Sequence, residues 1–508
     1  MRQSLAIATM SGLVGGCSLI FDPNNLGKPA DGPPPIIDAP VDVEVIMPAN
    51  PSNIAVASIY PPTVDEGRGD HMSRPALLVL NGSNFTTLAD HLTATFALMG
   101  SDAMTGSGSG ILTIDSIDVG ADHDWIALGV RVPVDKNCHE GQHYEFSVSV
   151  SEDDGMGGSA KAMLSDPFVL TCHDELDGAW TGSATLSETK LWSEVALTGS
   201  PTFATGGGSA FIYSASTITV AGTMTANGGT SAAGPGGQPG GAAGATGGGA
   251  GGGAAGALLM AGGGGGFETV GGMGGSQTNG GGVVGEQEIM TFTGNFASGG
   301  GGGAAVGPVL GGAGGGGGGT IALFAYGDIT LGGTITANGG PGASSTEGGG
   351  GGAGGLVVVR TQGTLSGLTT VNVVGGQGMS GGGAGGNGRA RFDAAMFGQS
   401  IATTDAGSGT YYGPMPLDAP LITHTQTPMI GAVGQGFTTA MGQVENQNKS
   451  EPIRPFSVPF STTIPSTVMG VGPVPLTVGY NLVCMTVPAG DLQHQEVSSN
   501  CVEMAFLP

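Results

Sequence analysis

The chain has 508 residues, of which 104 are glycine, and its 39 acidic and 13 basic residues give a net charge of −26. Such an excess of acidic side chains excludes binding to nucleic-acid phosphates, which requires clustered Lys and Arg. The length predicts several domains rather than one. Because no stretch beyond the N-terminal segment repeats apolar residues at helical spacing over a useful length, we expect an all-β protein.

The N-terminus has the pattern of an export signal. Met1-Arg2-Gln3 is a short basic start, and Leu5 to Val14 is an apolar core too short to span a bilayer. The core ends in Leu13-Val-Gly-Gly-Cys17, which resembles the lipobox of bacterial lipoproteins. The resemblance implies that residues 1–16 are removed as a signal peptide, and that a lipid on Cys17 holds the protein to a membrane. A plain export signal with an incidental cysteine is the alternative.

The residues after the cysteine predict a location and a tether. Ser18 stands where an aspartate would favour the inner membrane, so the resemblance implies the outer membrane and cell surface of a Gram-negative bacterium. Within residues 17–51, the segment from Lys28 to Pro40 is rich in proline, which removes backbone donors and favours an extended, semi-rigid chain. Such a spacer would hold the folded part away from the lipid surface.

Residues 52–172 predict a β-sandwich, because apolar residues alternate along short strands. These strands run from Ala76 to Phe85, from Trp125 to Pro133 and from Tyr144 to Ser151. The region resembles the IPT/TIG family of immunoglobulin-like domains, whose pattern is matched by Pro61, Gly67, Leu77 to Leu80, Gly82, Asn84 and Phe85. The resemblance implies a binding or spacer module without catalytic residues.

Residues 173–411 are organised by a repeated motif. It spans Thr217 to Gly229, returns from Asp328 to Gly340, and appears in degenerate form from Thr364 to Gly376. The strands before the last two copies align at an offset of 36 residues, with Ile321 matching Val357 and Leu323 matching Val359. A repeat of this length predicts stacked units. Alternating apolar residues with a central glycine corner predict a β-solenoid-like region, and two facing sheets are the alternative.

Between the first two copies, residues 230–319 are very rich in glycine and contain no Lys, Arg or Cys. The glycine triplets break after a few repeats, which argues against collagen. Runs of glycine can pack as bundled polyproline-II-like helices, because no side chain keeps the backbones apart. We expect partly ordered glycine loops beside the β-array, and a disordered linker is the alternative.

Residues 412–508 predict a small C-terminal β-sandwich. Its clearest strands, Val478 to Pro488 and Cys501 to Pro508, are joined by a polar loop. Once Cys17 is set aside, four cysteines remain, and an even number in an exported chain predicts disulfides. Their neighbourhood in the sequence pairs Cys138 with Cys172 and Cys484 with Cys501, one bond in each flanking domain.

The sequence predicts no catalytic, cofactor-binding or metal site. The residues Cys138, His139, His143, Cys172 and His173 are of types that suit zinc, but paired cysteines in an exported chain more often form a disulfide. The many GxGxxG matches carry no information about nucleotides, since nearly any glycine-rich sequence contains them.

Two functions are consistent with these features. We favour a non-enzymatic surface lipoprotein with an adhesive or envelope-structural role, whose partners besides the membrane are glycans or other surface proteins. The alternative is a polysaccharide-binding or polysaccharide-active β-solenoid protein. A lyase needs cations near the scissile bond, and the array has none between Lys190 and Arg360. A hydrolase needs two carboxylates at a set separation, and the block offers the scattered acids Glu268, Glu286, Glu288, Asp328 and Glu347.

Overall fold

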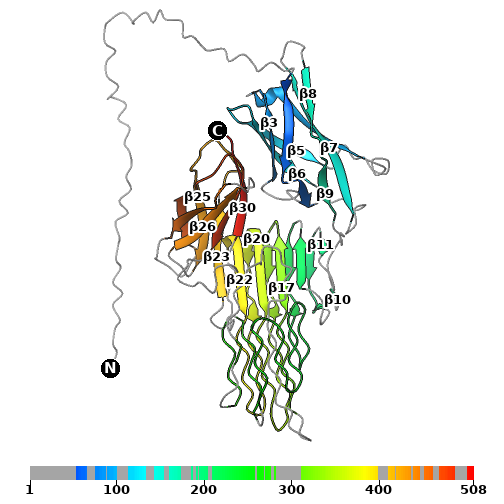
Figure 1. Ribbon diagram of the computed structural model, residues 1–508, viewed down its shortest axis with the longest axis vertical. Coiled ribbons are helices and arrows are strands. Elements are labelled where there is room, and N and C mark those ends of the chain that lie inside the picture. Colours follow the sequence, from blue (N-terminus) through cyan, green and yellow to red (C-terminus); the bar gives the residue numbers. More distant parts are fainter. Residues whose placement is uncertain are drawn as a thin grey trace, which may run out of the picture. The chain divides into compact units, whose positions relative to one another are not determined.

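The computed structural model describes residues 53–65, 75–86, 88–99, 112–132, 142–153, 159–172, 185–186, 190–192, 194–203, 209–214, 216–257, 260–267, 269–275, 280–281, 311–398, 410–417, 419–435, 439–446, 451–460, 468–486 and 500–508. Within these ranges the fold is all-β, as predicted, apart from one short 3₁₀ turn at Ala89–His91 (Figure 1). The described part of the chain contains no helix that is long and apolar enough to cross a membrane. The predicted signal peptide, Cys17 and the tether lie outside the described residues.

The N-terminal region is a two-sheet sandwich. One sheet has the order β1 (Ala55–Tyr60), β3 (Ala76–Ser83), β6 (Trp125–Arg131), β5 (Thr113–Val119). The other has the order β2 (Thr63–Asp65), β9 (Phe168–Thr171), β7 (His143–Asp153), β4 (Leu92–Leu98), with β8 (Ser159–Met163) paired to β7. The predicted corner after β3 has a physical reason: the Phe85 ring is fully buried and lies against Gly82, where a Cβ would overlap it. Asn84 takes the left-handed conformation, with φ of 62°, that lets the chain turn there.

The middle of the chain winds into parallel coils of three short strands. The first coil has β11 (Lys190–Trp192), β12 (Val195–Leu197) and β13 (Thr202–Phe203), with β10 (Thr185–Leu186) pairing to β13. The next coils have β14 (Ala210–Ser214), β15 (Ile218–Val220) and β16 (Thr223–Thr225), then β17 (Thr320–Ala325), β18 (Ile329–Leu331) and β19 (Thr334–Thr336). The last have β20 (Leu356–Ser366) and β21 (Thr370–Asn372), and finally β22 (Arg389–Phe397). All neighbouring coils pair in parallel, as a solenoid requires.

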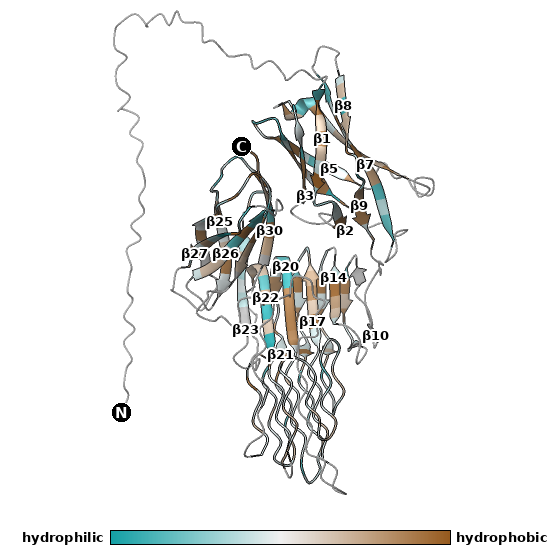
Figure 2. Ribbon diagram, in the orientation of Figure 1, coloured by the Kyte–Doolittle hydropathy of each residue, from teal (hydrophilic) through white to brown (hydrophobic). Residues whose placement is uncertain are grey.

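The register between coils is the one that the repeat predicts. Ile321 pairs with Val357 and Leu323 with Val359, at the offset of 36 residues. Equivalent apolar side chains stack inside, as Ile218, Ile329 and Leu365 do, and all three are fully buried. Figure 2 shows these strands as the apolar part of the region. The first and second motifs pair at an offset of 111 residues, because the glycine-rich segment is inserted between them.

The glycine-rich chains form a bundle. We use the name glycine bundle for the described residues of 226–281, 311–319, 337–355 and 373–388, which leave the coils as extended chains without strand pairing and return to them (Figure 1). Along residues 312–320, every third backbone N–H donates to the same neighbouring chain. Gly312, Gly315 and Gly318 donate to the carbonyl oxygens of Glu347, Gly350 and Ala353. In the same way, Gly314, Gly317 and Thr320 donate to those of Gly241, Gln238 and Pro235, and Gly316 and Gly319 donate to those of Gly229 and Ala226. Three residues per turn and hydrogen bonds only between chains are the geometry of polyproline-II-like helices.

The spacing of these chains explains why they are glycine. A Cβ on Gly315 would overlap the carbonyl group of Gly340, and one on Gly352 would overlap that of Gly316. Only a residue without a side chain allows backbones to come this close. The described chains therefore adopt the bundled arrangement that the sequence offered as one interpretation, and they are more regular than the loops that we expected.

The C-terminal region continues the sheet of the coils. β23 (Thr410–Leu417) pairs in parallel with β22 and antiparallel with β25 (Met429–Gln435), which pairs with β28 (Val468–Pro473). The predicted boundary at residues 411 and 412 thus falls inside β23, and the sheet crosses it without a break. The second sheet has the order β24 (Ile422–Thr423), β30 (Asn500–Phe506), β29 (Gly479–Thr486), β26 (Thr439–Asn446), β27 (Arg454–Pro459).

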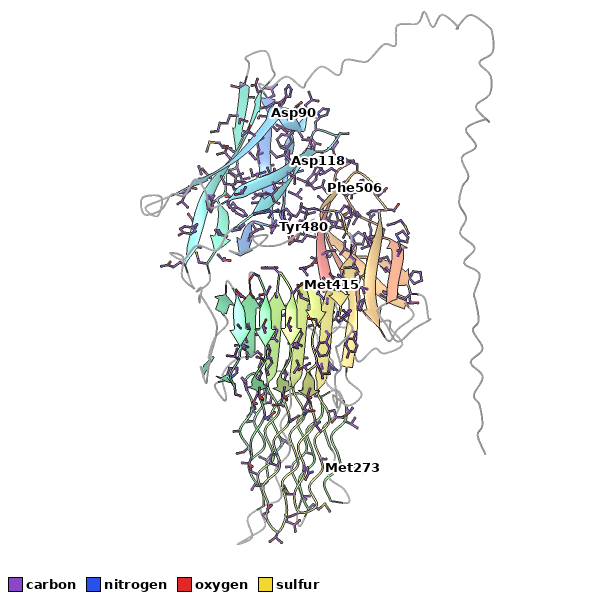
Figure 3. All side chains as sticks on the ribbon, turned by 180° about the vertical axis from the view of Figure 1, so that it is seen from behind. Asp90, Asp118, Met273, Met415, Tyr480 and Phe506 are labelled. Atoms are coloured by element: carbon purple, nitrogen blue, oxygen red, sulfur yellow. A yellow bond between two sulfur atoms is a disulfide. The ribbon has the colours of Figure 1, made fainter. Side chains whose placement is uncertain are left out.

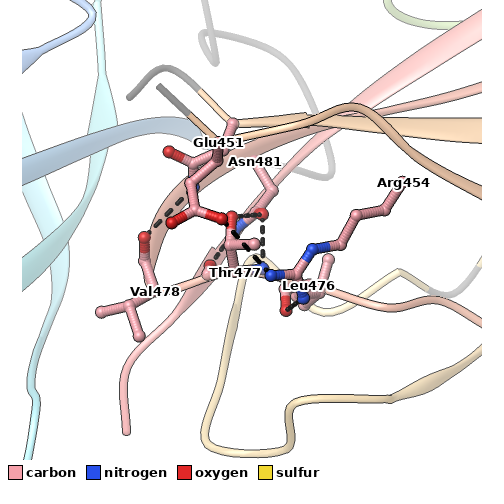
Figure 4. A network of polar contacts seen from close by, with 7 residues as sticks. Glu451, Arg454, Leu476, Thr477, Val478 and Asn481 are labelled. Carbon is pink, nitrogen blue, oxygen red and sulfur yellow. Dashed lines mark hydrogen bonds and ion pairs between the residues drawn. The ribbon is translucent and has the colours of Figure 1, made fainter. Parts of the chain in front are cut away.

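Two features stabilise the pair of strands predicted at the C-terminus. β29 and β30 are antiparallel, and a disulfide joins Cys484 to Cys501 across them, as predicted. The turn before β29 is held by the fully buried amide of Asn481, which accepts a hydrogen bond from the backbone of Thr477 (2.9 Å) and donates to its carbonyl oxygen (2.7 Å). Figure 4 shows this network, in which Arg454 also donates to the carbonyl oxygen of Leu476 (3.3 Å). Of the side chains described in this turn, Thr477 and Asn481 also bond to each other, from the hydroxyl of Thr477 to Oδ1 of Asn481 (3.0 Å).

Candidate functional site

The predicted disulfide and metal residues of the N-terminal sandwich are only partly described. Cys172 is buried and disulfide-bonded, whereas its predicted partner Cys138 lies outside the described residues. The imidazole of His143 is half-exposed and lies 3.6 Å from the Glu145 carboxylate. No group of three or more His, Cys, Asp or Glu side chains that could hold a metal ion occurs in the part of the chain that the structure describes.

The most unusual cluster of side chains lies on the outer face of the coil sheet. In β22, Ala390, Phe392 and Ala394 point into the coil core, so the alternating residues Arg389, Arg391 and Asp393 point to the other face. All three charged residues are fully buried. Figure 2 shows β22 as hydrophilic beside the apolar strand β20. A strand with charges on one face and apolar residues on the other is ordinary at a surface, but here both faces are covered.

Asp393 is the shared partner of two arginines. Arg391 donates from Nε to both carboxylate oxygens (2.9 and 2.8 Å), and its Nη2 lies 2.8 Å from Oδ1. Arg360, from the neighbouring strand β20, places Nε and Nη2 each 3.0 Å from Oδ2. Burial lowers the pKa of Arg391 from its ordinary value, and the Asp393 carboxylate opposes that shift. Arginine nevertheless stays protonated, so the two guanidinium groups and one carboxylate together carry a charge of +1.

Aromatic rings extend the same row across the sheet. Tyr213, Phe324, Arg360 and Asp393 occupy matching positions on four successive strands. The rings of Tyr213 and Phe324 stack with centroids 5.0 Å apart, and the guanidinium carbon of Arg360 lies 5.8 Å from the Phe324 centroid. At the other end of the strands, Arg389 lies 4.9 Å from the centroid of Phe267, the buried aromatic residue that the glycine bundle contributes. Both contacts are in the range of cation–π attraction.

A cavity of about 120 Å³ opens beside this row. Its walls come from the ends of β14 and β17, the turn after β17 and the middle of β20: Tyr213, Ser214, Phe324, Ala325, Tyr326, Arg360 and Gln362. A wider groove of about 410 Å³ follows the corners of the coils, where Gly222, Gly332 and Thr334 are among the lining residues. The groove offers hydroxyl groups and backbone only, whereas the cavity combines a charge, aromatic rings and an amide. The cavity is therefore the better candidate for a specific site.

Sequence reasoning missed this cluster. The sequence pattern identified Arg360 only as the end of a stretch without cations, and it predicted no role for Arg389, Arg391 and Asp393. Coil stacking brings residues from 213 to 393 into one row, a distance in sequence that no local pattern bridges. The available signal was Arg389-Ala-Arg-Phe-Asp393, where charges alternate with apolar residues in a strand expected to be buried. Of the scattered acids, Asp328 has a structural contact, since its Oδ1 accepts a hydrogen bond from the backbone of Thr364 (2.6 Å).

Comparison with known proteins places the chain in no group: no protein-family model, no curated protein and no solved structure matches it.

Proposed function

We propose that this chain is a non-enzymatic, lipid-anchored protein of the cell surface with an adhesive or envelope-structural role. The observation that carries the proposal is the glycine bundle. It is a regular projection from the coils in which backbone groups hydrogen-bond to backbone groups of neighbouring chains. Such a structure keeps its form without a hydrophobic core of its own, because backbone pairing takes the place of side-chain packing.

The surface of the bundle suits contact rather than catalysis. Among its described residues, Glu347 is the only one with an acidic or basic side chain. Exposed apolar side chains occur instead, as at Val270 (65% exposed) and Met273 (67%). Figure 3 labels Met273 on the bundle. A contiguous apolar patch on a surface of low charge would favour contact with another surface, and Val270 and Met273, three residues apart, are the side chains available to form it. An envelope component or a neighbouring cell would supply that surface.

The anchor is the part of the proposal that is most directly tested. If Cys17 carries a lipid, Cys17→Ser should move the exported protein from the membrane fraction to the soluble fraction. The measurement is fractionation of cells that express either form, followed by immunoblotting. Ser18→Ala, one residue beyond the cleavage site, is the matched control and should stay with the membrane. Equal membrane retention of both variants would refute the lipid anchor.

Polysaccharide binding is the second candidate, and the cavity beside Arg360 favours it. Catalysis at this site is disfavoured, because the carboxylate of Asp393 is fully buried and is paired with the guanidinium groups of Arg360 and Arg391. Such a carboxylate is not within reach of a substrate, as a general acid or base must be. A reducing-sugar assay on acidic and neutral polysaccharides should therefore detect no release of chain ends, and release would contradict the non-enzymatic proposal.

A further inference from the structure

The cavity beside Arg360 has a local charge opposite to that of the whole molecule. Arg360 and Arg391 share one carboxylate, and Arg389 lies on the same face of β22. Two of the 13 Lys and Arg residues of the chain thus meet at one carboxylate and leave a local charge of +1, while the chain as a whole carries −26. In physiological salt, exposed charges farther away than about 8 Å are largely screened, and the charged side chain that lines the cavity is Arg360. The cavity therefore favours an anion.

The aromatic wall strengthens this preference. β14 and β20 flank β17 on opposite sides, so Tyr213 covers one face of the Phe324 ring and the guanidinium group of Arg360 covers the other. Phe324 can then reach the cavity only with its ring edge. The edge of an aromatic ring carries positive partial charge, whereas its face carries negative charge. A ring edge beside a guanidinium group thus presents two positive features to the same space.

The size and the remaining walls define the ligand. A volume of about 120 Å³ holds more than one water molecule and suffices for one small head group. The phenols of Tyr213 and Tyr326 and the amide of Gln362 both donate and accept hydrogen bonds, as sugar hydroxyls do. A peptide carboxyl terminus presents the same carboxylate without the sugar hydroxyls, so it is the competing occupant that the first experiment tests.

We propose that this cavity binds the carboxylate of an acidic sugar of the uronic acid class, with Arg360 as its ionic partner. Guanidinium and carboxylate groups match in geometry, and their hydrogen bonds are stronger than those between neutral groups. The proposal rests on the polysaccharide-binding candidate and identifies its substrate class. It is independent of the lipid anchor, so the fractionation of Cys17→Ser and the binding test can fail separately.

The first experiment compares ligands on the full exported chain by titration calorimetry. Glucuronate should bind, whereas glucose, which has the same ring without the carboxylate, should not. Glucose 6-sulfate should bind more weakly than glucuronate, and a short peptide with a free carboxyl terminus should not bind. Equal binding of glucose, of the sulfate or of the peptide would overturn the proposal, and so would the absence of glucuronate binding up to about 10 mM.

The second experiment compares two arginines that each pair with an aspartate. Arg360→Gln should weaken glucuronate binding at least about tenfold, since it removes a charged hydrogen-bond donor from the site. The fold should persist, because Arg391 still neutralises Asp393. Arg131→Gln removes the same charge from the exposed pair with Asp115 in the N-terminal sandwich and should leave binding unchanged.

If Arg360→Gln fails to fold, Gln362→Ala replaces it and should weaken binding several-fold. Wild-type affinity in the cavity variant, or equal losses in both arginine variants, would refute the site.

Discussion

At the scale of single residues, Asp393 is a carboxylate on which two ion pairs depend. It is fully buried and is the carboxylate partner of both Arg360 and Arg391. A buried ion pair gains little over an apolar pair of the same shape, because desolvation offsets the attraction. Removing one member is different, since it leaves the other charge buried without compensation. The stability of the coil sheet near β22 should therefore depend on this one carboxylate.

We predict that Asp393→Ala lowers the local stability of β20 and β22 by about 3–5 kcal/mol, the usual cost of leaving a buried charge unpaired. Hydrogen exchange of the amides in these two strands measures the change without requiring the whole chain to unfold in one step. Asp115→Ala is the control, because its pair with Arg131 is partly exposed and is expected to contribute less than about 1 kcal/mol. Equal protection of β20 in wild type and Asp393→Ala would contradict this assignment.

At the scale of elements, the packing of the glycine bundle depends on the positions at which no side chain separates neighbouring backbones. Gly315 faces the backbone of Gly340 so closely that a Cβ would overlap its carbonyl group. Gly229 belongs to the same bundle, yet the nearest atoms to a Cβ there belong to Ala232 at 3.8 Å. Two glycines in one element thus differ in whether an added methyl group has space.

We predict that Gly315→Ala destabilises the bundle by about 1–3 kcal/mol, as overpacking does when the obstructing atoms are backbone. Gly229→Ala should be neutral or stabilising by up to about 1 kcal/mol, because alanine restricts the unfolded chain. Elastase digestion measures the difference, since the enzyme cleaves after small residues when the backbone is exposed. Faster cleavage within 226–319 is expected for Gly315→Ala alone. Rapid cleavage of the wild-type bundle would show that its chains are not packed in solution.

The sequence predicted the arrangement of the coils more fully than that of the glycine bundle or of the row of side chains from Tyr213 to Asp393. Alternation and the 36-residue offset were enough to place Ile321 opposite Val357, because each coil repeats the side-chain pattern of the last. The bundle has no such pattern, since its order lies in backbone hydrogen bonds that every glycine can make. The row from Tyr213 to Asp393 depends on the register of four strands at once. Its members could be recognised as neighbours only after the coils were stacked.

At the scale of the whole molecule, residues 48–508 form one compact unit. The sheet of the coils continues through β23 into the C-terminal sandwich. A further apolar cluster joins β3 and β6 of the N-terminal sandwich, through Leu77 and Ala127, to Tyr480 and Ala505 of β29 and β30. Tyr60 belongs to this contact, with its ring centroid 4.8 Å from that of Tyr480. The first and last sandwiches therefore share packing that neither has alone.

This contact should weaken at alkaline pH. Burial raises the pKa of the Tyr60 phenol above its ordinary value of 10.0, and the carboxylates of Glu445 and Glu503 raise it further. Above pH 10 the unfolded chain loses this proton before the folded chain does, so the unfolded state binds fewer protons and the free energy of unfolding falls as pH rises. Below pH 10 both states keep the proton and the contribution is constant.

Tyr60→Phe keeps the ring against Tyr480 and removes the ionisable group. Urea titrations from about pH 8 to about pH 11 should show a smaller alkaline loss of stability for Tyr60→Phe than for wild type. Parallel losses in the two proteins would show that Tyr60 ionises equally well in the folded chain, and that the contact does not shield it.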